Sequence, residues 1–213
     1  MTLGDVWLDF DPAALVTTGL DVDDDLAFLA LLALQRRGRL NLIGVSVTAG
    51  NAALRDTLDN AKRLLLLAGV KLEPAAGASY REMHVAWPWV RRLHNVRGDV
   101  AGSPDAVDAI RAAVRARPPR SLTVIALGPL TNVAAALADS QIAGRVGRVV
   151  SMGGALDGGR LDLNWMSDRA AARAVLASNV PLTIVPVELC AQAAVQPEDV
   201  DRVVDRCCPG AAV

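Results

Sequence analysis

The chain has 213 residues, 52% of them hydrophobic, and a formal net charge of -1. This length supports one substantial hydrophobic core, so we expect residues 1–213 to form a single domain. Basic residues are scattered among acidic ones, which excludes the basic stripe typical of proteins that bind nucleic acid or an anionic membrane. The expected partner is therefore a small neutral or polar molecule.

The cysteines and the apolar stretches favour a cytoplasmic protein. Cys190, Cys207 and Cys208 lack the regular spacing of a disulfide framework. The longest apolar stretch, residues 26–34, is too short to cross a bilayer, and the N-terminus has no basic and apolar leader. We therefore expect neither a signal peptide nor a membrane anchor.

Continuous apolar runs alternate with stretches of helical composition. Continuous runs are typical of parallel strands covered on both faces. The order predicts an α/β fold, an open and mostly parallel sheet with helices on both faces. The expected strands are 6–10, 42–47, 122–127, 146–152 and 182–187, and the expected helices are 24–37, 54–68, 104–116, 130–138 and 168–178.

Two of these helices carry start signals. Pro129 follows the third expected strand and supplies the backbone dihedral favoured in a first helical turn. Before the last helix, Ser167 or Asp168 can act as a cap by accepting backbone N–H bonds. We expect the helices to begin at these residues.

Three carboxylates lie where they can meet at one edge of the sheet. Asp11 leaves the first expected strand, while Asp23 and Asp24 stand where the next helix begins. Ligands of open parallel sheets bind beyond the carboxyl ends of the strands. Repulsion among the three groups requires a cation, and hard oxygen ligands suit Ca²⁺ or Mg²⁺. Zinc is disfavoured because the cysteines and histidines lack ligand-like spacing.

Helix capping is the simpler explanation of an aspartate at such a place. It contributes about 0.3 to 1 kcal/mol through backbone hydrogen bonds and the helix dipole. Capping consumes one acid rather than three, so a metal site explains Asp11, Asp23 and Asp24 better. Asp21 and Asp25 are expected to be loop and helix-start charges.

The ordered motifs of the chain carry a family resemblance. Asp9-Phe10-Asp11-Pro12 and Asp23-Asp24 match the two halves of the signature Asp-x-Asp-Pro-Gly-x-Asp-Asp, with AALVTTGLDV inserted between them. Further blocks follow in order: GVSVTAGN with DTLDNAKRLL, IALGPLTNVAAAL, VVSMGGAL and DLNWMSDRAAARAVL. Together they resemble the inosine–uridine-preferring nucleoside hydrolase family, which implies that family's fold, with a Rossmann-like core, over most of residues 6–186.

The resemblance implies hydrolysis of the N-glycosidic bond of a ribonucleoside around one Ca²⁺, releasing base and ribose as in purine and pyrimidine salvage. By carry-over, Asp11 and Asp24 ligate calcium through their carboxylates, and Leu127 does so through its main-chain carbonyl. Asp11 is also the general base for the attacking water. Asp162 replaces the family's glutamate and is one methylene shorter for reaching the 5′ hydroxyl. The residues expected to contact substrate are Asp23, Asn51, Met152, Asp162 and Asn164.

These roles agree with the chemistry of glycoside cleavage. The reaction builds positive charge on the sugar, so a pocket rich in carboxylates favours the transition state over the neutral substrate. Calcium orients the water and the ribose diol and makes the water more acidic. The resemblance also implies a homo-oligomer.

Family members continue beyond the last residue of this chain and carry a His-Asp pair there. In the family, the aspartate completes the calcium shell and the histidine lies beside the leaving base. No His-Asp dipeptide occurs in these 213 residues. We therefore expect a C-terminally short member: a truncated product, a compact variant with altered chemistry, or a noncatalytic relative that keeps the sugar pocket.

A long irregular segment, residues 77–103, holds both histidines of the chain, His84 and His94, together with Trp87 and Trp89. Loops of this length are usually functional. One prediction is an active-site lid whose aromatic or imidazole groups contact the leaving base. The other is that the tryptophans pack against the core and the histidines face solvent.

Two functions of other classes remain open. Asp9-Phe10-Asp11 also resembles the opening of haloacid-dehalogenase-type phosphatases, but these need a later lysine, and Lys62 and Lys71 lie in or just after a helical stretch. The second alternative is a nonenzymatic module that binds ribose or a ribonucleoside without turnover. Base release from inosine and uridine distinguishes it from an enzyme.

Overall fold

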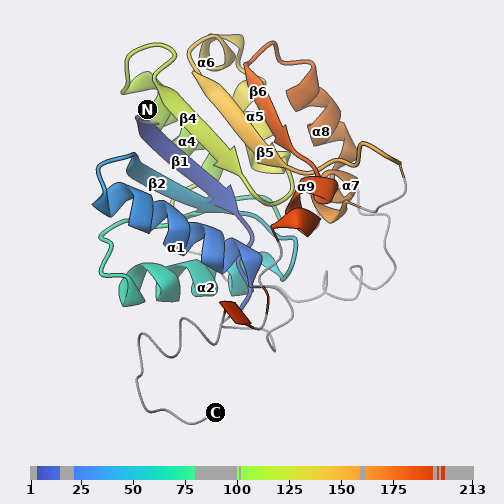
Figure 1. Ribbon diagram of the computed structural model, residues 1–213. Helices are drawn as coiled ribbons and strands as arrows, with labels where there is room; N and C mark the ends of the chain where they lie inside the picture. The colour runs from blue at the N-terminus through green and yellow to red at the C-terminus, as the bar shows by residue number, and fades with distance from the viewer. Residues whose placement is uncertain are drawn as a thin grey trace, which may run out of the picture.

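Six parallel strands form the central sheet of the computed structural model, which describes residues 4–14, 22–79, 100, 102–158, 162–193, 196 and 198–199 (Figure 1). Within these residues the strand order is β3-β2-β1-β4-β5-β6, and all neighbouring strands are parallel. This is the order of a Rossmann-type sheet, and the predicted α/β fold is confirmed. The bounds are β1 Asp5–Phe10, β2 Asn41–Val47, β3 Ala75–Ala76, β4 Leu122–Ala126, β5 Arg148–Met152 and β6 Leu182–Val185.

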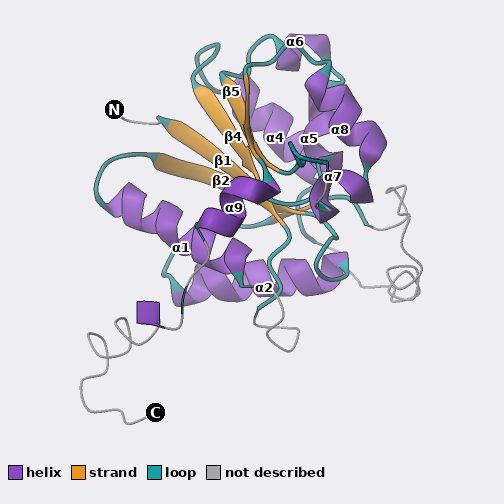
Figure 2. Cartoon of the chain, turned by 45° about the vertical axis from the view of Figure 1, so that its right-hand side comes forward, coloured by secondary structure: helices purple, strands orange, loops and turns teal. Residues whose placement is uncertain are grey.

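Helices cover both faces of the sheet, as Figure 2 shows. α1 and α2 pack into one apolar cluster, and α4, α5 and α8 pack into another on the opposite face. None of the helices in the described part of the chain has the length and apolar character needed to cross a membrane. The bounds are α1 Asp23–Arg36, α2 Leu54–Leu67, α4 Ala106–Arg115, α5 Thr131–Leu137, α6 Ser140–Ala143, α7 Leu163–Ser167, α8 Arg169–Leu176 and α9 Val187–Gln192.

The expected strands and helices are all present, with ends that differ from the predictions by at most two residues. Val187 was predicted as strand but begins α9, because Pro186 has no N–H to continue the ladder. Val146 was also predicted as strand, but its N–H donates to the carbonyl of Ile142 at 3.1 Å, just beyond α6. The elements β3, α6, α7 and α9 were not predicted, because each is too short to give a periodic pattern.

The two helix-start signals have different outcomes. Leu130 is the N-cap of α5, so Pro129 precedes the helix rather than lying in its first turn. Asp168, not Ser167, caps α8, and its carboxylate accepts the N–H of Ala171 at 2.9 Å. Ser167 instead donates its hydroxyl to the carbonyl of Leu163, so it stabilises the last turn of α7.

The order of the strands creates a crevice at one edge of the sheet. The chain connects β1 to β2 on one side, while β4 pairs on the other side of β1. Strand connections that diverge in this way leave a crevice beyond the carboxyl ends. Where β1 and β4 end, the N–H of Leu127 donates to the carbonyl of Asp9 over 2.9 Å. Asp11 and Leu127 therefore border the crevice from adjacent strands.

A stacked aromatic pair fixes α1 against the end of β1. The rings of Phe10 and Phe28 have centroids 6.1 Å apart and an interplanar angle of 28°. Both side chains are completely buried. Stacked pairs of this kind contribute beyond their buried area, so the first turns of α1 are held close to the residues that follow β1.

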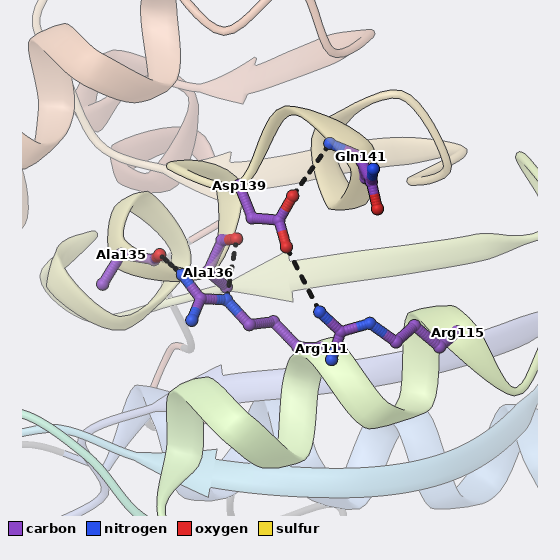
Figure 3. A network of polar contacts seen from close by, with 6 residues as sticks. All are labelled: Arg111, Arg115, Ala135, Ala136, Asp139 and Gln141. Atoms are coloured by element: carbon purple, nitrogen blue, oxygen red, sulfur yellow. Dashed lines mark hydrogen bonds and ion pairs between the residues drawn. The ribbon is translucent and has the colours of Figure 1, made fainter.

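On the opposite face, two arginines of α4 tie the ends of neighbouring helices together (Figure 3). Arg111 donates to the carbonyls of Ala135 and Ala136 at 2.6 and 3.3 Å, which lie in the last turn of α5. Arg115 forms an ion pair with Asp139, the N-cap of α6, at 3.2 Å. Terminal carbonyls of α5 that have no partner within the helix are thereby satisfied.

Replacing Phe28 by alanine should lower the free energy of unfolding by about 3 to 5 kcal/mol, because it removes a fully buried ring and leaves a cavity. Leu29→Ala is the matched control, since this neighbouring side chain is 51% exposed and should cost under about 1 kcal/mol. Urea denaturation measures both values. Equal losses in the two variants would contradict the packing assigned to α1.

Candidate functional site

A cavity of about 200 Å³ lies at the carboxyl edge of the sheet. It brings together residues that are far apart in the sequence, including all of the predicted metal and substrate residues except Asp11. The cavity is lined by Asp23, Asp24, Asn51, Leu127, Met152, Asp162, Leu163, Asn164 and Val187. Leu163 and Val187 were not predicted, because apolar residues in short helices give no chemical signal.

Asp11 lies directly after β1 and is only 1% exposed. Its Oδ2 accepts the N–H of Asn51 at 2.7 Å. A Cβ atom on Gly50 would lie 1.9 Å from Oδ2, and a Cβ atom on Gly128 would lie 2.3 Å from Oδ1. Only glycine leaves room for the carboxylate at these two positions, so the ends of β2 and β4 enclose Asp11 from both sides.

Asp24 approaches Asp11 from the first turn of α1. It is buried, and its Oδ2 accepts the backbone N–H of Asp11 at 3.3 Å. Asp23 is exposed, and its Oδ1 accepts the N–H of Asp24 at 2.9 Å. The N-cap of α1 is Val22, which makes no side-chain cap. The two aspartates therefore face the cavity rather than simply capping the helix.

The electrostatics of this group favour a cation. Burial raises the pKa of Asp24 well above its usual value, and the nearby charges of Asp11 and Asp23 raise it further. A cation beside Asp24 would offset both effects. In the described part of the chain, no three side chains of His, Cys, Asp or Glu form a metal-binding group. The donors that fit a hard cation are thus two carboxylates with main-chain oxygen.

Asn164 links three parts of the cavity wall. Its side-chain amide donates to the carbonyl of Leu127, and it lies 3.1 Å from the sulfur of Met152. The ends of β4 and β5 and the start of α7 are therefore joined by one side chain. The Leu127 carbonyl, predicted as a metal ligand, already accepts this bond. A carbonyl oxygen has two lone pairs and retains one for a further partner.

Asp162 has a structural task that the sequence did not predict. It caps α7, with Oδ1 accepting the N–H of Asn164 at 3.0 Å and Oδ2 accepting that of Trp165 at 3.0 Å. Oδ2 also accepts the N–H of Gly154 at 2.8 Å. The carboxylate therefore ties the start of α7 to Gly154, just after β5, and its contact with a substrate hydroxyl stays a prediction.

Two other expectations concern residues near the cavity. Asp25 was expected to be only a helix-start charge, but it is buried and accepts a hydrogen bond from the side-chain amide of Asn60 at 2.9 Å, which ties α1 to α2. Asp21 lies outside the described residues. So do the four residues assigned to the lid or the leaving base, His84, Trp87, Trp89 and His94.

An α/β sheet with an acidic cavity at its switch point is the architecture of enzymes that bind ligands at the carboxyl edge. The family model of the inosine-uridine preferring nucleoside hydrolases matches residues 6–209. The chain belongs to this family, as the motifs predicted. The phosphatase alternative loses its support, and neither of its lysines, Lys62 nor Lys71, is among the described residues that line the cavity.

Individual relatives agree with this assignment. The pyrimidine-specific ribonucleoside hydrolase RihA of Shewanella sp. (strain MR-4) is 30% identical over 202 residues, which cover 85% of this chain and 60% of that protein. The purine-preferring ribonucleoside hydrolase of Gardnerella vaginalis is 25% identical with a TM-score of 0.74, over 94% of this chain and 66% of that one. The plant nucleoside hydrolase PpNRh1, at 23% identity and a TM-score of 0.71 over 94% of this chain and 65% of that one, shares the fold. This chain thus spans about 60% of the RihA length.

The buried carboxylate of Asp9 should make stability depend on pH. Burial raises its pKa from the usual 3.8 to about 6, against hydrogen bonds from Ser46 and Asn132 that lower it. The folded state then holds a proton that the unfolded chain has lost. The contribution of Asp9 to stability is therefore fully present below about pH 4 and is lost as the pH rises through about 6, a change of about 3 kcal/mol.

The measurement is urea denaturation of the wild type and of Asp9→Asn between pH 4 and pH 7, with a chelator present. Subtracting the two curves removes the other titrating groups. The stability advantage of the wild type should shrink by about 3 kcal/mol as the pH rises. A constant difference would show that Asp9 titrates normally.

Proposed function

We propose that the cavity binds the ribose of a ribonucleoside and that the chain hydrolyses its N-glycosidic bond, with Ca²⁺ held at Asp11 and Asp24. The observation that carries this proposal is the close approach of these two buried carboxylates beside the cavity: Asp24 lines it together with two amide side chains, and Asp11 is hydrogen-bonded to the lining residues Asp24 and Asn51. Family membership supports it, because members of this family are generally metal-dependent. Leu127 is the proposed main-chain ligand.

Each proposed role follows from position. Asp11, fixed by the N–H of Asn51 and by two glycine backbones, is the base that takes a proton from the attacking water. Calcium, when bound, supplies positive charge that makes this water more acidic. Asp23 is exposed at the cavity and reaches ribose hydroxyls as an acceptor. Together the carboxylates favour the positive charge that develops on the sugar.

The size of the cavity supports recognition of the sugar rather than the whole nucleoside. Its volume of about 200 Å³ is below the roughly 300 to 1,000 Å³ typical of pockets for larger organic ligands. Ribose occupies the cavity, with Asn51, Met152, Asp162 and Asn164 as its proposed neighbours, and the base projects beyond it. Relatives named for pyrimidine and for purine nucleosides agree with a shared sugar site.

The cellular compartment and the oligomeric state of the protein are part of the same proposal. Cys190 has a free thiol, which is compatible with the reducing cytoplasm. We propose a cytoplasmic homo-oligomer, in which the described residues supply the sugar site. We also propose that residues 77–103 act as a lid and contact the leaving base.

Asp11→Ala should abolish calcium binding and reduce base release from inosine and uridine by at least about 1,000-fold, because one residue supplies both a ligand and the base. Calorimetry measures the metal affinity and absorbance measures the released base. Asp56→Ala is the control, since Asp56 is a partly exposed carboxylate on α2 that pairs with Arg55 at 3.5 Å. Unchanged metal affinity in Asp11→Ala would refute the assignment, and sugar binding without base release in the wild type would favour the binding module.

Calcium binding should release protons, because the raised pKa of Asp24 leaves part of its population protonated in the metal-free protein. The dissociation constant for calcium should therefore rise as the pH falls. Calorimetric titrations in two buffers with different ionisation enthalpies measure the number of protons released. Equal heats in both buffers would contradict a protonated Asp24, and Asp24→Asn should reduce the release.

A further inference from the structure

Asn132 is a buried polar residue to which none of the proposed roles applies. It lies in the first turn of α5 and is 1% exposed. Its Nδ2 donates to Oδ1 of Asp9 at 2.9 Å and to the carbonyl of Val47 at 3.1 Å, and its Oδ1 accepts the N–H of Ala78 at 2.8 Å. One side chain therefore joins the end of β1, the end of β2 and the segment after β3.

The first connection from Asn132 to the site runs along β1. Asp9 precedes Asp11 by two residues, and its carboxylate also accepts the hydroxyl of Ser46 on β2 at 2.5 Å. Ser46 in turn accepts the indole N–H of Trp7 at 2.8 Å. Asp9 is thus held by Ser46 of β2 and by Asn132 of α5. Because Asp11 follows Asp9 by only two residues, fixing Asp9 restricts the position of Asp11.

The second connection runs through the segment after β3. The carbonyl of Ala78 accepts the N–H of Ala49 at 2.9 Å. Ala49 leads directly to Gly50 and Asn51, and the N–H of Asn51 donates to Asp11 at 2.7 Å. Asn132 is therefore connected to Asp11 by two routes, each made of hydrogen bonds and a short stretch of backbone.

We propose that Asn132 is a positioning residue that fixes the carboxylate of Asp11 and the backbone of Asn51 at the carboxyl edge of the sheet. This inference rests on the proposed function, because it takes Asp11 as the base and Asn51 as a ribose ligand. Removing the amide leaves a buried carboxylate, an N–H and a carbonyl without this partner, so the strand ends must shift to satisfy them. A displacement of about 1 Å at a catalytic group costs about 100-fold in rate.

The first test compares Asn132→Leu with Thr131→Val in the full chain. Leucine is close in size to asparagine and forms none of the three bonds. Thr131 is the adjacent residue of α5, and its hydroxyl donates to Asp168 at 2.8 Å, away from the network. We expect kcat for base release to fall about 100-fold in Asn132→Leu and to stay within about twofold in Thr131→Val. A folded Asn132→Leu protein with normal kcat would overturn the inference.

The second test exchanges the two partners. Asn132→Asp removes the amide N–H groups that the carboxylate of Asp9 and the carbonyl of Val47 accept, and it places a second carboxyl group beside that of Asp9. Adding Asp9→Asn restores a donor and an acceptor in reversed order, although the bond to Val47 is still missing. The double variant should recover at least about tenfold in kcat over Asn132→Asp. No recovery would indicate that the bond between these residues does not position the site.

Hydrogen exchange separates this inference from the proposed function. In Asn132→Leu the amide of Asn51 should exchange more than about tenfold faster relative to that of Val124, which lies in the core strand β4. An unchanged ratio would overturn the positioning role whether or not the protein is an enzyme. A wild type that releases no base, but shows this change on substitution, would reject the proposed function alone.

Discussion

The enclosed carboxylate of Asp11 is the constraint on which the arrangement of this edge depends. An ionised carboxylate taken out of water is costly unless donors or a cation compensate. The N–H of Asn51 supplies one such contact, and the backbones of Gly50 and Gly128 close around both oxygens. These residues follow β2 and β4, the two neighbours of β1 in the sheet. The position of Asp11 therefore depends on the order of the central strands, because that order places the two glycines on either side of its carboxylate.

The second carboxylate, Asp24, is held there by contacts of other residues of α1. Phe28 stacks on Phe10, and Asp25 is bonded to Asn60, so α1 is anchored to the sheet and to α2. The first turn of the helix cannot withdraw without losing these contacts. Burial, together with repulsion from Asp11, therefore raises the pKa of Asp24 while the helix stays in place. Packing that keeps neighbouring carboxylates together despite their repulsion is typical of sites that bind a cation.

Much of the fold and of the cavity could be predicted from the sequence. Continuous apolar runs mark buried parallel strands, and the motifs around Asp11, Asp24, Asn51 and Asn164 follow those strands in order. The cap formed by Asp162 could not be predicted, because a five-residue helix leaves no periodic pattern. The bonds of Asn132 could not be predicted either, since they join residues as much as 123 positions apart. Such contacts depend on tertiary distances, on which local patterns carry no information.

The glycines beside Asp11 also affect how this site tolerates sequence change. Gly50 and Gly128 have no side chain and therefore supply no reactive group. Even the smallest substitution at either position places an atom inside the carboxylate's volume. The most restrictive positions of the site are therefore those that contribute least to its chemistry. Sequence variation in this pocket is therefore limited by the space around the carboxylate of Asp11 as well as by the need for the carboxylate itself.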